Sequence, residues 1–349
     1  MRRKSDEKRV LVALSGGVDS SVAAALLQAS GYQVEGAIMI LEGMKQENIG
    51  FAEAVAKQLS IPFHHFDLRQ QHQDEVIDYF VREYQRGRTP NPCVVCNRVI
   101  KFGLFMRKAQ ELGIEGMATG HYAGIARQNS RYLLNKGVDN NEQSYFLYRL
   151  DQEQLSKTLF PLGQYTKTQV RLNARKYKLS TAQRKKSQDV CFIPDGDYSS
   201  FLKSRIPVNP GPILNNEGRE VGQHKGIIHY TIGQRHGIGV SHKYPYYVTR
   251  IDVAKNVIYV GEKEQVYRKE CIARDLNFIP FDTLERRMNV AAKVRYFSPL
   301  AEAVIEPIAE DKVRVIFEEK QWAITPGQSV VFYQEDLVIG GGIIDQVVE

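Results

Sequence analysis

Long apolar runs and cysteine are both scarce in this chain of 349 residues. The longest apolar runs, such as residues 10–14 and 37–41, are strand-sized, whereas a helix needs about 20 apolar residues to cross a bilayer. The charged start, MRRKSDEKR, precedes only a short apolar run and lacks the core of a secretory signal. We therefore expect a cytoplasmic protein without a membrane span.

Cys93, Cys96, Cys191 and Cys271 are the only cysteines, too few for a disulfide scaffold. A special role for any of them would be catalysis, sulfur chemistry or metal binding. Because the chain has a single C-x-x-C pair, at Cys93 and Cys96, a four-cysteine zinc site is not expected. For Cys271, in the strand-like ECIARDL, we expect a buried inert thiol.

The chain also lacks solenoid repeats and low-complexity tracts, and its charge is only mildly unbalanced. Apolar residues make up 43% and charged residues 25%, which is typical of soluble globular proteins and excludes disordered and fibrous ones. Lys and Arg outnumber Asp and Glu by 47 to 40, giving a net charge of +7. This excess permits an anionic partner without requiring one.

The first third of the chain alternates between strand and helix patterns. Predicted strands lie at 9–14, 33–40, 62–68 and 116–119, and predicted helices at 19–29, 49–60, 73–86 and 97–112. This order predicts a Rossmann-like parallel sheet that binds ligands at the carboxyl ends of its strands. After about residue 206, short alternating runs predict one or two small β domains. The expected class is therefore α/β, followed by small mainly β domains.

The strongest local signal is SGGVDSS at residues 15–21, between the first strand and the first helix. Two glycines allow a tight turn, and the helix N-terminus favours a bound anion. The loop lacks the lysine of a Walker A motif and instead resembles the pyrophosphate loop of N-type ATP pyrophosphatases. The alternative is an ordinary strand-to-helix turn with a capping serine or aspartate.

The C-x-x-C pair begins a predicted helix after two prolines. With Arg88, Arg98 and Lys101 near in sequence, we expect its thiols to be biased toward thiolate. Taken alone, the pair could also be half of a zinc site, a redox pair or an accident. Cys191 follows basic residues but has apolar neighbours, so a buried inert thiol is as compatible with its sequence as a reactive one.

Eight segments match a single family, in order, along nearly the whole chain. They are SGGVDSS at 15–21, GRTPNPxxxCNxxIKF at 87–102, ATGHYA at 118–123, QSYFLYRL at 143–150, CFI at 191–193, GxHKGIIHYTIGQRHGIG at 222–239, VRYF at 294–297 and TPGQSVVFY at 325–333. On these segments the chain resembles the bacterial tRNA-specific 2-thiouridylases, the MnmA family. The resemblance implies an adenine nucleotide alpha hydrolase type of fold. It also implies an N-type ATP pyrophosphatase domain with a helical tRNA-binding extension at 1–205, a central small β domain at 206–275 and a C-terminal β-barrel at 276–349.

The resemblance further implies the reaction. With Mg²⁺, ATP adenylates O2 of the wobble uridine of tRNA and pyrophosphate leaves; sulfur held as a persulfide then attacks C2 and AMP leaves. The cysteine after PNPxxx, Cys96, would be the nucleophile, and the cysteine of CFI, Cys191, would carry the persulfide. The two would end as a transient disulfide. The partners implied are tRNA and a sulfur-donor protein or sulfide, and we expect a monomer.

The same matching gives two groups of binding residues. The residues expected to line the ATP site are Ala13, Leu14, Ser15, Gly16, Gly17, Val18, Asp19, Ser20, Met39 and Gly120. The residues expected to meet tRNA are Asn91, Pro92, Cys93, His121, Asn141, Glu142, Gln143, Arg295, Tyr296 and Gln328. For Arg295 and Tyr296 a solvated strand face is an equal alternative. Asn91, Pro92 and Cys93 would touch the target base, which must leave its stack to be reached.

The chain departs from the family pattern in two places. After Met39 the family has a longer acidic insertion, whereas here only ILEGMKQEN precedes the next helix. Cys93 stands where the family often has aspartate. Cys93, Cys96 and Cys191 could therefore hold three irons of a [4Fe–4S] cluster whose fourth iron hands sulfide to the base. The persulfide route, this cluster route and a zinc role stay open at this point.

Residues 154–188 contain nine Lys or Arg residues and no acid. The four spaced by four, four and three residues predict one charged stripe on a helix, namely Lys167, Arg171, Arg175 and Lys178. A solvated face is the ordinary meaning of such a run, but its place before Cys191 favours a surface that tracks RNA phosphates. Two other functions remain possible: a metabolite-adenylating ATP pyrophosphatase, and an RNA-binding protein with a vestigial loop.

Overall fold

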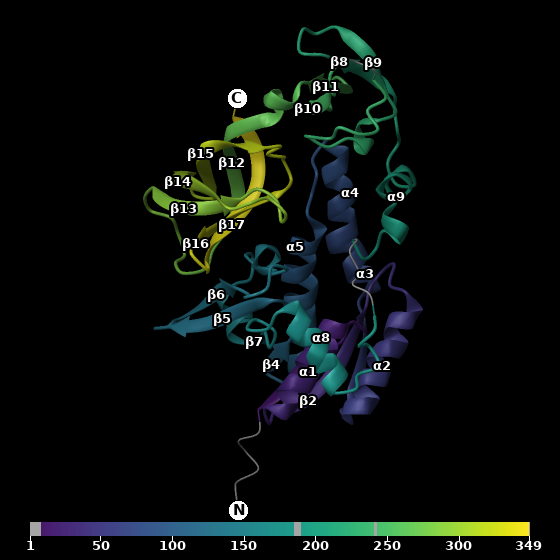
Figure 1. Ribbon diagram of the computed structural model, residues 1–349, viewed down its shortest axis with the longest axis vertical. Helices are drawn as coiled ribbons and strands as arrows, with labels where there is room; N and C mark the ends of the chain where they lie inside the picture. Colours follow the sequence, from purple (N-terminus) through teal and green to yellow (C-terminus); the bar gives the residue numbers. More distant parts are fainter. Residues whose placement is uncertain (1–7, 185–189, 241–242, 349) are drawn as a thin grey trace, which may run out of the picture. The chain divides into compact units, whose positions relative to one another are not determined.

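The structure is a computed structural model that describes residues 8–184, 190–240 and 243–348. The chain divides into two compact units (Figure 1). The first unit comprises Met1–Val76, Cys93–Phe192 and Asp336–Val338, and the second comprises Ile77–Pro92, Ile193–Glu335 and Ile339–Glu349. In the described ranges, every helix is too short or too polar to span a membrane.

The first unit is built on a five-stranded sheet in the order β3-β2-β1-β4-β7. Its strands are β1 (Arg9–Ala13), β2 (Gln33–Ile40), β3 (Phe63–Asp67), β4 (Gly116–Ala118) and β7 (Thr158–Leu159). The four neighbouring pairs all run parallel, which confirms the predicted Rossmann-like sheet. The strand order reverses between β1 and β4, and the loops that follow such a pair diverge to leave room for a ligand.

Helices connect these strands, and one more follows the last of them. They are α1 (Val18–Ala29), α2 (Gln46–Leu59), α3 (Arg69–His72), α5 (Pro92–Cys96), α6 (Phe105–Glu111), α7 (Gln152–Ser156) and α8 (Lys167–Lys176). Two stretches, η1 (Gln73–Ile77) and η2 (Asn97–Leu104), are wound as π-helix. The helix predicted at 97–112 is thus η2 followed by α6. A π-helical turn inside a helix often occurs at a functional site.

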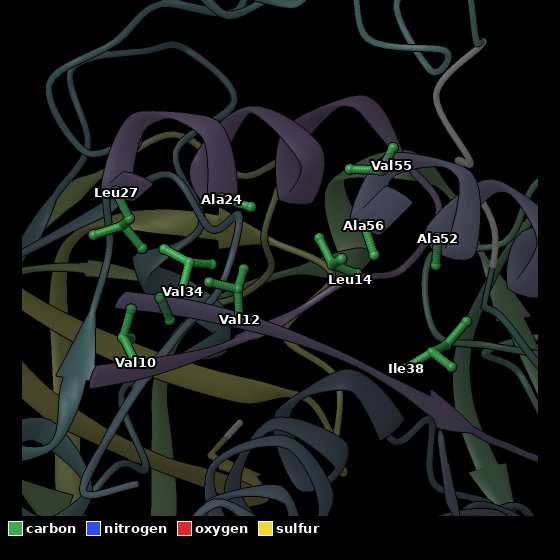
Figure 2. Close-up of a cluster of buried hydrophobic side chains, with 11 residues drawn as sticks. Val10, Val12, Leu14, Ala24, Leu27, Val34, Ile38, Ala52, Val55 and Ala56 are labelled. Atoms are coloured by element: carbon green, nitrogen blue, oxygen red, sulfur yellow. The ribbon is translucent and has the colours of Figure 1, made fainter. Parts of the chain in front are cut away.

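The core of the first unit lies between the sheet and two of its helices. Figure 2 shows Val10 and Val12 of β1 and Val34 of β2 pointing toward Leu27 of α1. Alternate residues of a strand share a face, so this spacing gives β1 one continuous apolar face. Ala52, on α2, belongs to the same buried cluster. Each such buried Val or Leu side chain contributes about 1.5–3 kcal/mol, so this packing fixes where the loop after β1 begins.

One hairpin in the first unit was not predicted. Its strands are β5 (Ala123–Gln128) and β6 (Arg131–Lys136), and β6 pairs with Leu337. Asn129, in the two-residue turn, adopts a left-handed φ of 54°. Asparagine tolerates this conformation better than most residues. The pair Asn129-Ser130 between two alternating runs is the signal that could have revealed the hairpin.

The described part of the second unit contains two α-helices and a small sheet. The helices are α4 (Asp78–Gln85) and α9 (Tyr198–Lys203), and the sheet has the order β10-β11-β8-β9. Its strands are β8 (Gly211–Leu214), β9 (Glu220–His224), β10 (Tyr247–Asp252) and β11 (Val257–Gly261). Ile213, Val248 and Ile258 form its buried centre. This sheet confirms the first of the two expected small β domains.

The same unit ends in a closed antiparallel barrel. Its strands are β12 (Tyr267–Phe278), β13 (Met288–Lys293), β14 (Ala301–Ala309), β15 (Lys312–Trp322), β16 (Ser329–Gln334) and β17 (Leu337–Val348). They follow the order β12-β15-β14-β13-β16-β17, and β12 also pairs with β17 to close the ring. Val313, Val315 and Phe317 alternate into its interior. The predicted C-terminal barrel is confirmed.

Candidate active site

The loop after β1 forms a compact turn at the start of α1. The hydroxyl oxygen of Ser20 accepts a hydrogen bond from the Ser15 amide at 3.1 Å, and the two hydroxyls lie 3.2 Å apart. Gly16 has a φ of 72°. Gly120, which follows β4, packs so closely that a Cβ there would lie 2.6 Å from the Ser20 amide nitrogen. The other positions expected to line the ATP site lie on neighbouring elements. Ala13 ends β1 and Leu14 follows it, Gly17 caps α1 and Val18 begins that helix, and Met39 lies near the end of β2.

Asp19 in the first turn of α1 is held by groups from two other segments. The Lys167 ammonium donates to both carboxylate oxygens, at 2.6 and 2.7 Å, and the Tyr122 hydroxyl donates at 2.8 Å. Lys167 is 148 residues away in sequence. This ion pair brings a cation beside the loop whose helix N-terminus favours anions.

Cys93 and Cys96 lie on α5 in the first unit, Cys96 with 6% of its surface exposed. Burial raises the pKa of the Cys93 thiol to about 11 and that of Cys96 to about 12, although the Lys101 ammonium acts in the opposite direction. The expected bias toward thiolate is therefore wrong for this arrangement. Removal from water outweighs the nearby cation, and Cys96 is followed directly by η2 rather than standing at a helix start.

Cys191 is exposed to solvent, whereas the next residue, Phe192, is buried. Crowding by the surrounding protein raises the pKa of the Cys191 thiol, and Lys101 again opposes the shift. The Phe192 ring contacts the His72 ring edge-on, with centroids 5.6 Å apart. The thiols of Cys93 and Cys191 also influence the titration of Cys96. The Lys101 charge thus acts on all three predicted thiols, and the three cysteines lie in the same unit.

The three thiols do not form a preassembled metal site. Within the ranges that the structure describes, which include all three, no set of three or more His, Cys, Asp or Glu side chains is placed to hold a metal ion. An iron–sulfur cluster needs its thiolates around one centre, so these residues do not fit a cluster in this arrangement. Cys271 lies buried in β12, where burial raises the pKa of its thiol to about 12.

Three family models match the chain in order along its length. They are the tRNA methyl transferase HUP domain over residues 8–195, the tRNA methyl transferase PRC-barrel domain over 199–262 and the aminomethyltransferase beta-barrel domain over 268–344. The tRNA-specific 2-thiouridylase MnmA 1 of Clostridium botulinum is 46% identical over 355 residues, covering 97% of this chain and 100% of that protein. The MnmA 2 of a Thermoanaerobacter species is 48% identical over 357 residues, covering 97% and 98%. The chain belongs to the tRNA-specific 2-thiouridylase family.

In this member of the 2-thiouridylase family, several positions expected to meet tRNA bind their own chain in the first unit. His121 shares a hydrogen bond with Thr119 at 2.7 Å, and burial holds its pKa well below the usual range. Glu142 is buried, and one of its carboxylate oxygens accepts a hydrogen bond from the Ser144 amide at 2.8 Å. Gln143 accepts the Tyr122 amide at 3.1 Å. Asn141 remains exposed.

Apart from Cys93, the other expected tRNA positions lie in the second unit. Gln328 donates to the carbonyl oxygen of Thr89 at 2.8 Å, and so supports the segment that leads to Asn91 and Pro92. Arg295 donates to the carbonyl oxygens of Ile232 and Ala323 at 3.0 and 2.9 Å, and Tyr296 follows it, half-buried. Next in the chain, Phe297 is 94% exposed and contacts the Tyr296 ring, with centroids 4.7 Å apart. The sequence analysis missed Phe297, although it ends the matched VRYF segment.

The basic run does not form the predicted stripe. Lys167 binds Asp19 instead of facing solvent, and Lys178 lies beyond the end of α8 in a left-handed conformation with a φ of 52°. Arg184 donates to the carbonyl oxygen of Gly16 at 2.7 Å. Two cations of the run thus contact the loop at residues 15–20, because tertiary contacts decide which way each side chain turns. Lys185 and Lys186 lie outside the described residues.

Proposed function

We propose that this chain is a tRNA-uridine 2-sulfurtransferase that uses ATP to replace the C2 oxygen of the wobble uridine with sulfur. Family membership supports the product and the tRNA substrate. The observation that carries the proposal is that one compact unit contains both the phosphate loop, residues 15–20, and the three cysteines Cys93, Cys96 and Cys191. A metabolite-adenylating pyrophosphatase would need only the loop, and an RNA-binding protein would need neither.

In the first step the phosphate loop holds ATP through the Ser15 and Ser20 hydroxyls, the loop backbone and the N-terminus of α1. The uridine O2 attacks the α-phosphorus, the bond to the β-phosphate oxygen breaks, and pyrophosphate leaves. This step is useful because a carbonyl oxygen is a poor leaving group and AMP is a good one. Mg²⁺ is proposed to enter with the triphosphate. Asp19, the carboxylate of the loop, is engaged by Lys167 on both oxygens.

In the second step Cys191 carries the incoming sulfur as a persulfide. Its terminal sulfur loses a proton and attacks C2, and AMP leaves with the former C2 oxygen. The Cys96 thiolate then attacks Sγ of Cys191 and breaks the S–S bond, which leaves the sulfur on C2. Cys96 and Cys191 end as a disulfide, oxidised by two electrons, and an external thiol reductant must reopen it. The exposure of Cys191 supports its role in receiving the outer sulfur of a persulfide on a donor protein, whose own cysteine leaves as a thiol.

The arrangement of the thiols favours this route over the iron–sulfur alternative, since Cys93, Cys96 and Cys191 are not placed around one ion. Anaerobic purification separates the two routes. Active protein without iron, labile sulfide or visible absorption agrees with the persulfide route. Iron and sulfide that rise together with activity would overturn it, and the complete loss of activity on replacing Cys93 would agree with the cluster.

The direct test incubates the protein with unmodified tRNA, ATP, Mg²⁺ and a sulfur donor, and measures 2-thiouridine by nuclease digestion and mass spectrometry. Cys96→Ser and Cys191→Ser should each abolish thiolation and leave ATP binding intact. Cys271→Ser is the matched control, because that buried thiol lies in the barrel. AMP and pyrophosphate formation without thiolation would favour a metabolite-adenylating enzyme, and no ATP turnover would favour a binding protein.

A further inference from the structure

Residues 43–48, the linking segment, touch both the phosphate loop and the chain beside Cys191. A Cβ on Gly16 would lie 2.4 Å from the carbonyl oxygen of Asn48, and a Cβ on Gly43 would lie 2.8 Å from Cα of Phe192. Both glycines have a positive φ, 72° and 76°. The main chains are therefore in direct contact at each end. This segment belongs to the short connection that stands in place of the acidic insertion expected after Met39.

Arg184 ties the linking segment to the phosphate loop a second time. Besides its bond to the Gly16 carbonyl, its guanidinium donates to Oε1 of Glu47 at 3.1 Å and to Oδ1 of Asn48 at 3.0 Å. The same guanidinium lies 4.1 Å from the centre of the Phe51 ring. A planar group held from several directions permits little independent movement. The loop carbonyl and the start of α2 should thus move together.

At the other end, the linking segment lies against a buried anchor for an exposed thiol. Phe192 is 3% exposed and packs on Gly43 and His72, whereas Cys191 reaches solvent. Packed main chains are not compressible, so a small shift at one contact must pass to the next or break it. The contacts are therefore continuous from Gly16 to Phe192, entirely within the first unit.

We propose that the linking segment couples ATP binding at the phosphate loop to the position of the Cys191 thiol. This inference rests on the proposed use of ATP. An anion bound by the loop amides shifts the Gly16 carbonyl that Arg184 holds, and the linking segment carries that shift to Phe192. Gly43 and Arg184 are positioning residues here, since they act through their neighbours. The sulfur carrier would then respond to the nucleotide before any tRNA is present.

The experiment measures how fast iodoacetamide alkylates Cys191 in the full chain, with and without ATP and without tRNA, by mass spectrometry of the Cys191 peptide. Equilibrium dialysis of the same samples measures ATP binding. We expect ATP to change the alkylation rate by about fivefold or more, the lower end of ordinary coupling between sites.

Two variants should remove this response at ATP concentrations that the dialysis shows to be saturating for each variant. Gly43→Ala places a methyl group against the Phe192 backbone, and Arg184→Met removes the guanidinium while keeping an unbranched side chain. Gly50→Ala is the matched control, because a Cβ there meets nothing within 4 Å and the residue lies in α2. It should keep the full response. Circular dichroism of each variant confirms that it has folded.

An unchanged Cys191 alkylation rate in wild-type protein that binds ATP would overturn the inference, and so would a full response in folded Gly43→Ala and Arg184→Met. If thiolation proceeds in that case, the proposed function stands and only the coupling fails. If the wild type binds no ATP, the proposed function fails and the coupling fails with it.

Discussion

The His72 imidazole should make the first unit less stable in acid. Its side chain is fully buried, and neither ring nitrogen has a hydrogen-bond partner in the described part of the chain. Burial, aided by the Lys101 charge, lowers the pKa of His72 to about 4 from its ordinary 6.5. Between these two pKa values, His72 is therefore protonated in the unfolded chain and neutral in the folded chain. Stability is complete above the ordinary pKa and is lost as pH falls toward the folded value.

The size of this loss follows from the two pKa values. Their difference corresponds to about 3 kcal/mol at full protonation, and about 2 kcal/mol of it should disappear between about pH 7 and about pH 5. His72→Phe removes both ring nitrogens and keeps an aromatic ring against Phe192. It should abolish most of this pH dependence and leave stability near pH 7 unchanged or higher, because no unpartnered polar atom is buried.

Hydrogen exchange of peptides covering residues 69–77 is the suitable assay. Trp322, the only tryptophan, lies on β15 in the other unit, so its fluorescence does not report on His72. The opening free energy is compared at the two pH values after correction for intrinsic exchange. Val76→Ala, at a fully buried position, is the control and should lower this free energy equally at both. If His72→Phe keeps the full acid dependence, the reasoning is refuted.

Three further outcomes are expected. Lys167→Met should weaken ATP binding about tenfold in equilibrium dialysis, because it leaves the Asp19 carboxylate without its cation beside the phosphates. It should affect tRNA binding far less. Equal losses of affinity for ATP and for tRNA would indicate that Lys167 binds RNA. Phe297→Ala should cost about 1–3 kcal/mol of tRNA affinity if a base stacks on that exposed ring, with thermal stability unchanged. The rate of sulfur release in a single turnover should rise about tenfold per pH unit from about pH 7 to about pH 9. The pKa of Cys96 is raised to about 12, so the fraction of reactive thiolate grows about tenfold with each unit in this range. A rate that levels off in this range would show that tRNA binding lowers the pKa of Cys96.

The pattern of residues along the chain was enough to predict the elements whose side chains alternate or recur over a few residues. The strand predicted at 33–40 is β2 with the same bounds, because alternation and β-branched residues act within the strand itself. The hairpin of β5 and β6 was not predicted, because its turn is Asn-Ser and not the Asn-Gly or Asp-Gly pair that most strongly indicates a hairpin. The expected boundaries at residues 205 and 275 stay predictions.

The sequence by itself determined the alternating α/β order, the phosphate loop, the family and the identity of the three thiols, since each depends on residue type and spacing. Only the tertiary structure decided what those groups are in context. Burial raises the pKa of Cys96, so the group expected to be a thiolate is a thiol. Lys167, expected on a surface stripe, binds Asp19 beside the loop after β1. Both outcomes depend on solvent exclusion and on charges brought together from distant segments, and the spacing of residues along the chain carries neither.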